Sequence, residues 1–249
     1  MDNHFFNKKI AVVIPCFNES ESIETVVSSI VLLKKNSGLD LTAVVVNDCS
    51  TDNSIEIIRK LDCVAIDLPI NLGIGGTVQT GVRFAFEKGF DIAIQMDGDG
   101  QHPASEIPKL LAVFGEKQNI DVSIGSRFLE KKGFQSSFMR RVGIVYFSKL
   151  IQLFFNKKIT DPTSGFRAFN RKAMKVIDGY YPNQYPEPEI LVHFFHHKLT
   201  VAETPVVMSG RLGGVSSISS WKSIYYMLKV SLGIVFSHIR LTRYGTDKY

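Results

Sequence analysis

Short apolar runs alternate with amphipathic segments through the first half of the chain. The runs have the length of strands and lie at residues 10–15, 41–47, 63–68, 90–96 and 122–126. Segments with helical spacing of apolar residues separate them, at residues 20–35, 53–60, 75–88 and 103–115. This alternation predicts an α/β fold, with a mostly parallel sheet flanked by helices.

The second half of the chain is less regular. It contains predicted helices at residues 142–155 and 189–197, a turn-rich stretch at 161–167 and a strand at 200–207. A loop rich in glycine and serine follows at residues 209–220, and a long apolar helix follows the loop. No linker or internal repeat divides the chain, so we predict one domain over residues 1–218 and an appended C-terminal helix with a tail over 219–249.

The C-terminal helix, predicted at residues 222–240, is apolar on most sides. Its polar positions form a narrow stripe of Lys222, Lys229, Gly233, Ser237 and Arg240. This amphipathic pattern predicts a helix that lies in the interface of a membrane, because Lys229 interrupts the apolar run well short of the roughly 20 residues that span a bilayer. The helix at 142–155 is bracketed by basic pairs, which favours contact with anionic lipid, but burial in the core or in a dimer interface is the alternative.

Composition narrows the range of partners. The chain has 249 residues and a net charge of +5, and its basic residues concentrate after residue 130. This asymmetry indicates an anionic surface or substrate, and no sequence signature of a nucleic-acid reader accompanies it. Three cysteines, an odd number without the spacing of metal ligands, are predicted to be reduced core residues. The N-terminus lacks the pattern of a signal peptide, so we expect a cytoplasmic protein attached peripherally to the inner face of the membrane.

Two carboxylates lie one residue apart where a predicted buried strand ends. Asp97 and Asp99 are separated by Gly98, and alternate residues of an extended chain point the same way, so both can flank one hard divalent cation. An EF-hand calcium loop is excluded, because its sixth and twelfth positions would be His102 and Pro108 instead of glycine and glutamate. A purely structural loop is the alternative.

Polar residues also follow two other predicted strands. Glu19 follows a proline-shaped loop at the start of a helix, where anionic groups are favoured, or it only caps that helix. Asp48 is placed to accept a hydrogen bond from an N–H of a nucleotide base. The glycines at residues 73–76 do not fit the spacing of a dinucleotide fingerprint, and they follow the third predicted strand instead of the first.

Six short motifs follow one another along the chain in a fixed order. They are P-C-F-N-E at residues 15–19, N-D-C-S-T-D at 47–52, N-L-G at 71–73, D-G-D-G-Q at 97–101, G-S-R at 125–127 and S-G-F-R at 164–167. Together they resemble the inverting GT-A glycosyltransferases of family 2, of the dolichol-phosphate mannosyltransferase type, and the resemblance covers nearly the whole chain. It implies a GT-A fold, a UDP-, GDP- or dTDP-sugar donor, and a Mg²⁺ or Mn²⁺ ion.

The resemblance also implies roles for individual residues. The donor nucleotide would contact Pro15, Phe17, Asn18, Glu19, Asn47, Asp48, Gly73, Asp97 and Gly98. The metal ion would be bound by Asp97, Asp99 and Gln101. Arg127 would approach the phosphates, and the acceptor would contact Ser164 and Arg167. The family commonly has two aspartates where this chain has Asn47-Asp48, which leaves the preferred base open.

Two acidic residues precede a helix in the second half. Glu187 corresponds to a position at which related inverting enzymes carry a general base, and Glu189 lies beside it on the helix. A hydroxyl acceptor would need such a base, whereas a phosphate acceptor is already ionised, and both residues could instead cap the helix. Arg167 and Arg211 are predicted to lie in loops, and the glycines around Arg211 suit either a catalytic lid over a diphosphate or an ordinary solvated connection.

Taken together, these features predict a metal-dependent, inverting glycosyltransferase. It would move a sugar from a nucleotide diphosphate donor to a lipid-phosphate or lipid-linked glycan acceptor at the cytoplasmic face of a membrane, and dimerisation is left open. The alternative is a catalytically silent, nucleotide-binding membrane adaptor of a polysaccharide assembly complex, which only Asn47 favours. A nucleotidyltransferase is excluded, because the first loop lacks the glycine-rich, basic sequence that cradles a triphosphate.

Overall fold

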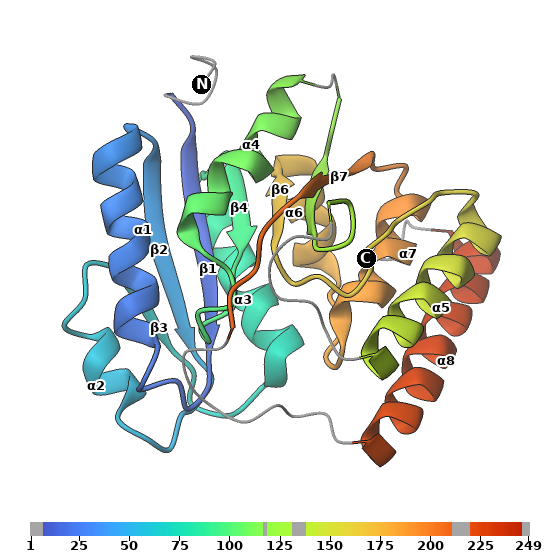
Figure 1. Cartoon of the computed structure of the whole chain (residues 1–249), viewed down its shortest axis with the longest axis horizontal. Helices are drawn as coiled ribbons and strands as arrows, with labels where there is room; N and C mark the ends of the chain where they lie inside the picture. The colour runs from blue at the N-terminus through green and yellow to red at the C-terminus, as the bar shows by residue number, and fades with distance from the viewer. Residues whose placement is uncertain (1–6, 117–118, 131–137, 211–219, 246–249) are drawn as a thin grey trace.

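One seven-stranded sheet organises the protein. The computed structural model describes residues 7–116, 119–130, 138–210 and 220–245. Its strands are β1 (Lys9–Cys16), β2 (Asp40–Asn47), β3 (Val64–Asp67), β4 (Ile92–Gln95), β5 (Val122–Ser126), β6 (Arg167–Asn170) and β7 (Val201–Pro205). Figure 1 shows the sheet covered by helices, with two long helices, α5 and α8, side by side at one end of the molecule.

The strand order is β3-β2-β1-β4-β6-β5-β7. Every neighbouring pair is parallel except those of β6, which runs antiparallel to both β4 and β5. The predicted mostly parallel sheet is therefore confirmed, and each of the five strands predicted in the first half is present.

The prediction of a turn-rich stretch at residues 161–167 is wrong for its last residue. A strand, β6, begins at Arg167 and is followed at once by α6 (Arg171–Gly179), and neither was predicted. A strand of four residues is too short to show a clear alternation, and its neighbours decide that it forms. Asn170 ends the strand and starts the helix, because its side chain accepts a hydrogen bond from the backbone N–H of Ala173.

Helices cover both faces of the sheet, because alternate strand residues point to opposite sides. On one face, Ile10, Val12 and Ile14 of β1 share a core with α1 (Ile23–Ser37), α2 (Ser54–Ile58), the short 3₁₀ helix η2 (Ala104–Glu106) and α4 (Ile107–Glu116). On the other face, Ala11 and Val13 share a core with α3 (Gly73–Glu87), α6 and α7 (Pro186–His196). Figure 1 shows α1 and α4 on the near face.

The cysteines bear out the sequence prediction only in part. All three are free thiols, but only Cys16 is fully buried, while Cys49 and Cys63 are partly exposed. Burial raises the pKa of Cys16 to about 12, so this thiol stays protonated and inert. Cys49 lies in a loop with a positive φ of 58° and is not a core residue.

The predicted long C-terminal helix is confirmed as α8 (Ser220–Tyr244), and the helix predicted before it is α5 (Phe138–Phe155). These two helices and α7 share a third core cluster of Phe147, Val192, Val230, Ile234 and Leu241. The predicted domain boundary at residues 218 and 219 lies outside the described residues. In the described part of the chain, no helix has both the length and the apolar character needed to cross a membrane.

A close approach fixes the start of α3 against the loop that precedes α7. The backbone N–H of Gly75 donates to the carbonyl oxygen of Asn183 at 3.1 Å. A Cβ atom on Gly75 would lie 1.9 Å from the carbonyl oxygen of Pro182, so only glycine fits.

We therefore expect Gly75→Ala to lower the free energy of unfolding by about 1 to 3 kcal/mol, because the loop or the helix must move. Gly143→Ala in α5 is the matched control, since its new Cβ would make an ordinary contact at 3.9 Å with Met227. This control should be neutral or stabilise by up to about 1 kcal/mol. Urea unfolding measures both, and equal stabilities of the two variants would contradict the packing described here.

Candidate functional site

The candidate site forms where the carboxyl ends of β1, β2 and β4 meet. The end of β1 and the loop that follows it touch the loop after β4, because a Cβ on Gly98 would lie 3.1 Å from the carbonyl oxygen of Pro15 and 3.7 Å from Cγ of Glu19. The Ser22 hydroxyl joins the same loops, lying 2.7 Å from the Gly98 carbonyl oxygen and 3.0 Å from Oε2 of Glu19. Pro15, Glu19 and Gly98 are thus brought together, and their contact with a nucleotide stays a prediction.

The loop that carries Asp97 and Asp99 is held by internal hydrogen bonds. The N–H of Asp97 donates to Nδ1 of His102 at 3.1 Å, and the N–H of Gln101 donates to Oδ1 of Asp99 at 3.0 Å. His102 is buried and stacks on Phe166 at a centroid distance of 5.0 Å. Burial lowers the pKa of His102 to about 4, so its neutral ring can accept this bond. Sequence reasoning used His102 only to exclude calcium and missed this role.

The two aspartates suit a hard divalent cation shared with a substrate. The Asp97 side chain is 37% exposed, whereas Asp99 is 5% exposed. Within the described ranges, no three His, Cys, Asp or Glu side chains converge as a complete metal site. Mg²⁺ is usually held by one or two carboxylates together with substrate phosphates, so the donor set fits such an ion. The metal contact of Gln101 stays a prediction.

Asp48 binds the start of α3. Its carboxylate accepts hydrogen bonds from the N–H groups of Leu72 at 2.6 Å and Gly73 at 2.9 Å. Gly73 has a positive φ of 74°, which explains the glycine at this position. The N–H of Gly73 is thereby engaged within the protein. The predicted base contact of Asp48 stays a prediction, because a carboxylate has further lone pairs.

The loop after β1 also contacts the loop after β2. The N–H of Asn18 donates to Oγ of Ser50 at 3.0 Å, and Oδ1 of Asn18 accepts from the N–H of Thr51 at 2.8 Å. Asn18 has a positive φ of 55°, a conformation that asparagine tolerates. The neighbouring Phe17 is 48% exposed, which leaves its ring accessible to a base.

Asn47 is bonded within the protein, and its predicted contact with the nucleotide stays a prediction. Asn47 is 2% exposed, and its Nδ2 donates to Oδ1 of Asp67 at 2.8 Å. Oδ2 of Asp67 accepts in turn from Nη2 of Arg59 at 3.1 Å. An aspartate at position 47 would face the carboxylate of Asp67, so the departure from the family pattern has a local structural reason.

A buried ion pair holds Arg127. Its Nε and Nη2 each lie 2.7 Å from an oxygen of Asp161, which is fully buried. Glu203 on β7 then holds the Asp161 loop, because its carboxylate accepts from the N–H groups of Thr160 and Asp161, both at 2.8 Å. Burial raises the pKa of Glu203. Sequence reasoning missed Asp161 and Glu203, since neither forms a repeating pattern, and the phosphate contact of Arg127 stays a prediction.

Arg167 was predicted to lie in a loop, but it is the first residue of β6 and is fully buried. Its Nε donates to the carbonyl oxygen of Ser164 at 2.7 Å and its Nη2 to that of Pro162 at 2.8 Å. Ser164 is 1% exposed. The predicted contacts of Arg167 and Ser164 with an acceptor stay predictions. Gly165, in the same loop as Ser164, lies against Asp97, because a Cβ atom added to it would be 3.2 Å from Oδ1 of Asp97.

Glu187 and Glu189 face different surroundings. Oε1 of Glu187 lies 3.5 Å from Nε2 of Gln95, whose own oxygen accepts from the Tyr181 hydroxyl at 2.9 Å. Burial raises the pKa of Glu187, an effect that the nearby Arg167 opposes and Asp97 reinforces. Glu189 instead accepts from the Ser237 hydroxyl of α8 at 2.8 Å. Glu189 therefore faces α8, whereas Glu187 lies near enough to Asp97 to feel its charge, and the catalytic role of either residue stays a prediction.

Arg211 lies outside the described residues, so its predicted lid role is not assessed. The segment that leads to it is attached to the site, because the N–H of Ser209 donates to the carbonyl oxygen of Gln101 at 3.0 Å.

The Asn47–Asp67 contact predicts a specific rescue. Asn47→Asp should lower the free energy of unfolding at pH 7 by about 1 to 3 kcal/mol, because a buried carboxylate at position 47 then faces the carboxylate of Asp67. Adding Asp67→Asn should restore most of this loss, since the lost Arg59 pair is exposed and weak.

The same contact predicts a pH dependence. Repulsion raises the pKa of one carboxyl in the folded Asn47→Asp variant, so its deficit is largest at pH 7 and shrinks as the pH falls towards about 4. Urea unfolding at both pH values measures this, and a double variant no more stable than Asn47→Asp would refute the explanation.

Comparison with known proteins agrees with the resemblance. The family model described as Glycosyl transferase family 2 matches residues 11–178. The UDP-N-acetylglucosamine–dolichyl-phosphate N-acetylglucosaminyltransferase of Methanococcus voltae is 28% identical over 255 residues, covering 92% of this chain and 98% of the relative. The dolichol-phosphate mannosyltransferase of Pyrococcus furiosus is 31% identical over 233 residues, covering 89% of this chain and 62% of the relative.

A solved structure supports the fold. Glucosyl-3-phosphoglycerate synthase from Mycobacterium tuberculosis, in complex with Mn²⁺, UDP-glucose and phosphoglyceric acid, superposes with a TM-score of 0.68 at 19% identity. The match covers 97% of this chain and 82% of that one, and it confirms the predicted GT-A fold. Because the family model spans more than half of the sequence, this chain is a glycosyltransferase that belongs to glycosyl transferase family 2.

Proposed function

We propose that this protein transfers a sugar from a nucleoside diphosphate donor to a polyprenyl phosphate, with inversion at the anomeric carbon. The observation that carries the proposal is the loop of Asp97 and Asp99, which lies between the nucleoside-side loop of Glu19 and the Gly165 loop. Relatives named for transfer to dolichyl phosphate supply the acceptor class.

The donor side of the proposal rests on residues at the carboxyl ends of β1, β2 and β4. Phe17 offers an exposed ring to the base, and Asp97 and Asp99 would hold a Mg²⁺ or Mn²⁺ ion. When bound, the ion would offset negative charge on the departing diphosphate. We propose UDP as the nucleotide, because the similar M. voltae enzyme is named for a UDP-sugar and the similar solved structure contains UDP-glucose with Mn²⁺.

The acceptor side decides the role of Glu187. A phosphate acceptor is ionised at neutral pH and attacks without losing a proton, so a general base is unnecessary. We assign Glu187 to positioning instead, since its carboxylate contacts Gln95 on β4 and so joins the start of α7 to the strand that precedes Asp97. The acceptor's lipid places the reaction at a membrane surface, for which we propose the cytoplasmic face.

The silent adaptor is not favoured by any observation in the described residues. Asn47 was the only feature that suggested it, and the hydrogen bond to Asp67 explains Asn47 as a structural residue. Internal hydrogen bonds hold the loop of Asp97 and Asp99 in place, which supports the transferase.

Nucleotide binding tests the donor site first. UDP with Mn²⁺ at 100 times its dissociation constant should stabilise the protein by about 2.7 kcal/mol, which raises the melting temperature by roughly 5 to 10 °C for a chain of this size. Asp99→Asn should lose the Mn²⁺-dependent part, because it removes a carboxylate charge at the proposed ion. Asp62→Asn, at an exposed residue, is the matched control.

A thermal-shift panel of UDP, GDP and dTDP, each with and without Mn²⁺, makes the measurement. A larger shift with GDP or dTDP would replace UDP as the donor base, and the absence of any shift would overturn the donor site. NMR of the anomeric proton of the product tests inversion, and retention of the donor configuration would refute it.

Glu187→Gln tests the acceptor class, because glutamine keeps an oxygen for Gln95 while removing the base. With a phosphate acceptor, kcat/KM should stay within about tenfold of wild type, whereas loss of a general base costs about 10² to 10⁴. The rise of kcat/KM as the acceptor phosphate loses its second proton, near pH 6, should remain in the variant. A loss beyond a hundredfold would instead indicate a hydroxyl acceptor.

A further inference from the structure

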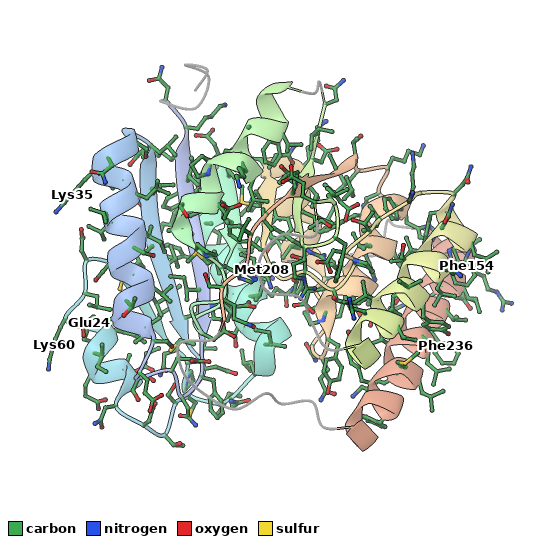
Figure 2. All side chains as sticks on the ribbon, in the orientation of Figure 1. Glu24, Lys35, Lys60, Phe154, Met208 and Phe236 are labelled. Atoms are coloured by element: carbon green, nitrogen blue, oxygen red, sulfur yellow. The ribbon has the colours of Figure 1, made fainter. Side chains whose placement is uncertain are left out.

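The helices α5 and α8 turn apolar side chains away from the protein. On α8, besides Tyr244 at its end, the exposed large residues are spaced three or four apart and therefore share one face: Tyr225, Leu228, Leu232, Phe236 and Ile239. On α5 they are Val142, Val145, Tyr146 and Leu153. Figure 2 shows Phe236 at the outer end of the molecule, opposite the end that carries Lys35 and Lys60.

These two sets lie on one surface, because the helices pack directly against each other. The Ser231 hydroxyl of α8 donates to the Tyr146 hydroxyl of α5 at 3.1 Å. Phe154 of α5 stacks on His238 of α8 at 4.7 Å between ring centroids. Figure 1 shows the two helices side by side. We call the nine residues the α5–α8 face.

Positive charge surrounds the α5–α8 face. The sequences of α5 and α8 contain no aspartate or glutamate. Exposed basic residues lie on these helices and just after α5, namely Arg141, Lys149, Lys157, Lys158, Arg240 and Arg243. An apolar centre with a basic border is typical of helices that lie in the headgroup region of an anionic bilayer.

We propose that the α5–α8 face docks on a bilayer that contains anionic lipid, with both helices lying in its interface. A symmetric dimer through this face would set one basic border against another without any acidic partner from either helix, so a second copy fits less well. No helix in the described ranges is suited to spanning, which agrees with docking in the interface plane.

The inner side of α8 links this surface to the candidate site. The Ser237 hydroxyl donates to Glu189 on α7 at 2.8 Å, and Tyr226 packs edge-on against Tyr185 at 4.6 Å. A Cβ on Gly233 would lie 2.5 Å from Oε2 of Glu189, so the glycine leaves room for the Glu189 side chain against α8. A docked α8 therefore holds the helix that carries Glu187 beside the membrane. This consequence rests on the proposed function, whereas the docking does not.

Flotation of the full chain with vesicles tests the docking. The protein should float with phosphatidylcholine vesicles that contain phosphatidylglycerol and bind weakly to phosphatidylcholine alone. Leu232→Glu and Leu153→Glu should each lower the bound fraction by about tenfold, because each places a charge in the apolar face. Leu32→Glu on α1 is the matched control, since Leu32 is 59% exposed and Leu232 is 54% exposed.

The charged border is tested separately. Lys149→Gln and Arg243→Gln should each weaken binding to anionic vesicles by about fivefold, and added salt should do the same. Equal binding to neutral and anionic vesicles would overturn the assignment to anionic lipid. Light scattering that shows a dimer in wild type and a monomer in Leu232→Glu, without flotation, would make the face a contact between two copies and refute the proposal.

Transfer assays distinguish this inference from the proposed function. Leu232→Glu should transfer normally to a short, water-soluble isoprenyl phosphate and poorly to a polyprenyl phosphate in vesicles. If wild type fails with both acceptors but the flotation pattern holds, the proposed function is wrong and the docking stands. If Leu232→Glu floats as well as wild type, the docking is wrong whatever the transfer activity.

Discussion

The antiparallel insertion of β6 between β4 and β5 is the constraint on which the site depends. Gln95, the last residue of β4, pairs with Arg167, the first residue of β6. The chain therefore leaves β4 and enters β6 at the same end of these two strands. Asp97 lies two residues after Gln95, and Gly165 lies two residues before Arg167, which explains why they meet. If β6 ran parallel to β4, the loop before it would lie at the opposite end of the strands. The antiparallel direction of β6 therefore brings the Gly165 loop against Asp97 in the candidate site.

Burying charge behind this loop is costly. Specific partners compensate most of these groups, although among the described residues Nη1 of Arg167 has no hydrogen-bond partner. Asp161 pairs with Arg127, and Arg167 donates to carbonyl oxygens of its own loop. Glu203 accepts from the loop backbone. Because each of these contacts works only in one loop conformation, the buried charges specify where Gly165 lies. Arg167 therefore helps to hold the loop, and its predicted contact with the acceptor stays a prediction.

The sequence predicted the layers of the fold because their signals repeat. Apolar runs of five to seven residues predicted the parallel strands of the first half. The D-G-D motif predicted where β4 ends and where the candidate site lies. Single side chains without a repeat were placed less well. Asn47 sits one residue from Asp48, and its amide donates to Asp67. His102 stacks on Phe166 of a distant loop, and Glu203 accepts from the backbone of another. Such directions depend on tertiary contacts that local pattern does not contain.

The separation of Glu187 from Glu189 follows from helix geometry. Residues two apart on an α-helix point about 200° from each other, so both carboxylates cannot face Asp97. Glu187 faces Gln95, and Glu189 is left to face α8, where Gly233 admits it and Ser237 binds it. The motif that suggested a pair of catalytic acids instead gives α7 two functional sides. The Glu187 side of α7 contacts the candidate site, and the Glu189 side contacts α8, which carries part of the α5–α8 face. Because α7 is one rigid helix, it fixes the position of the site relative to that face.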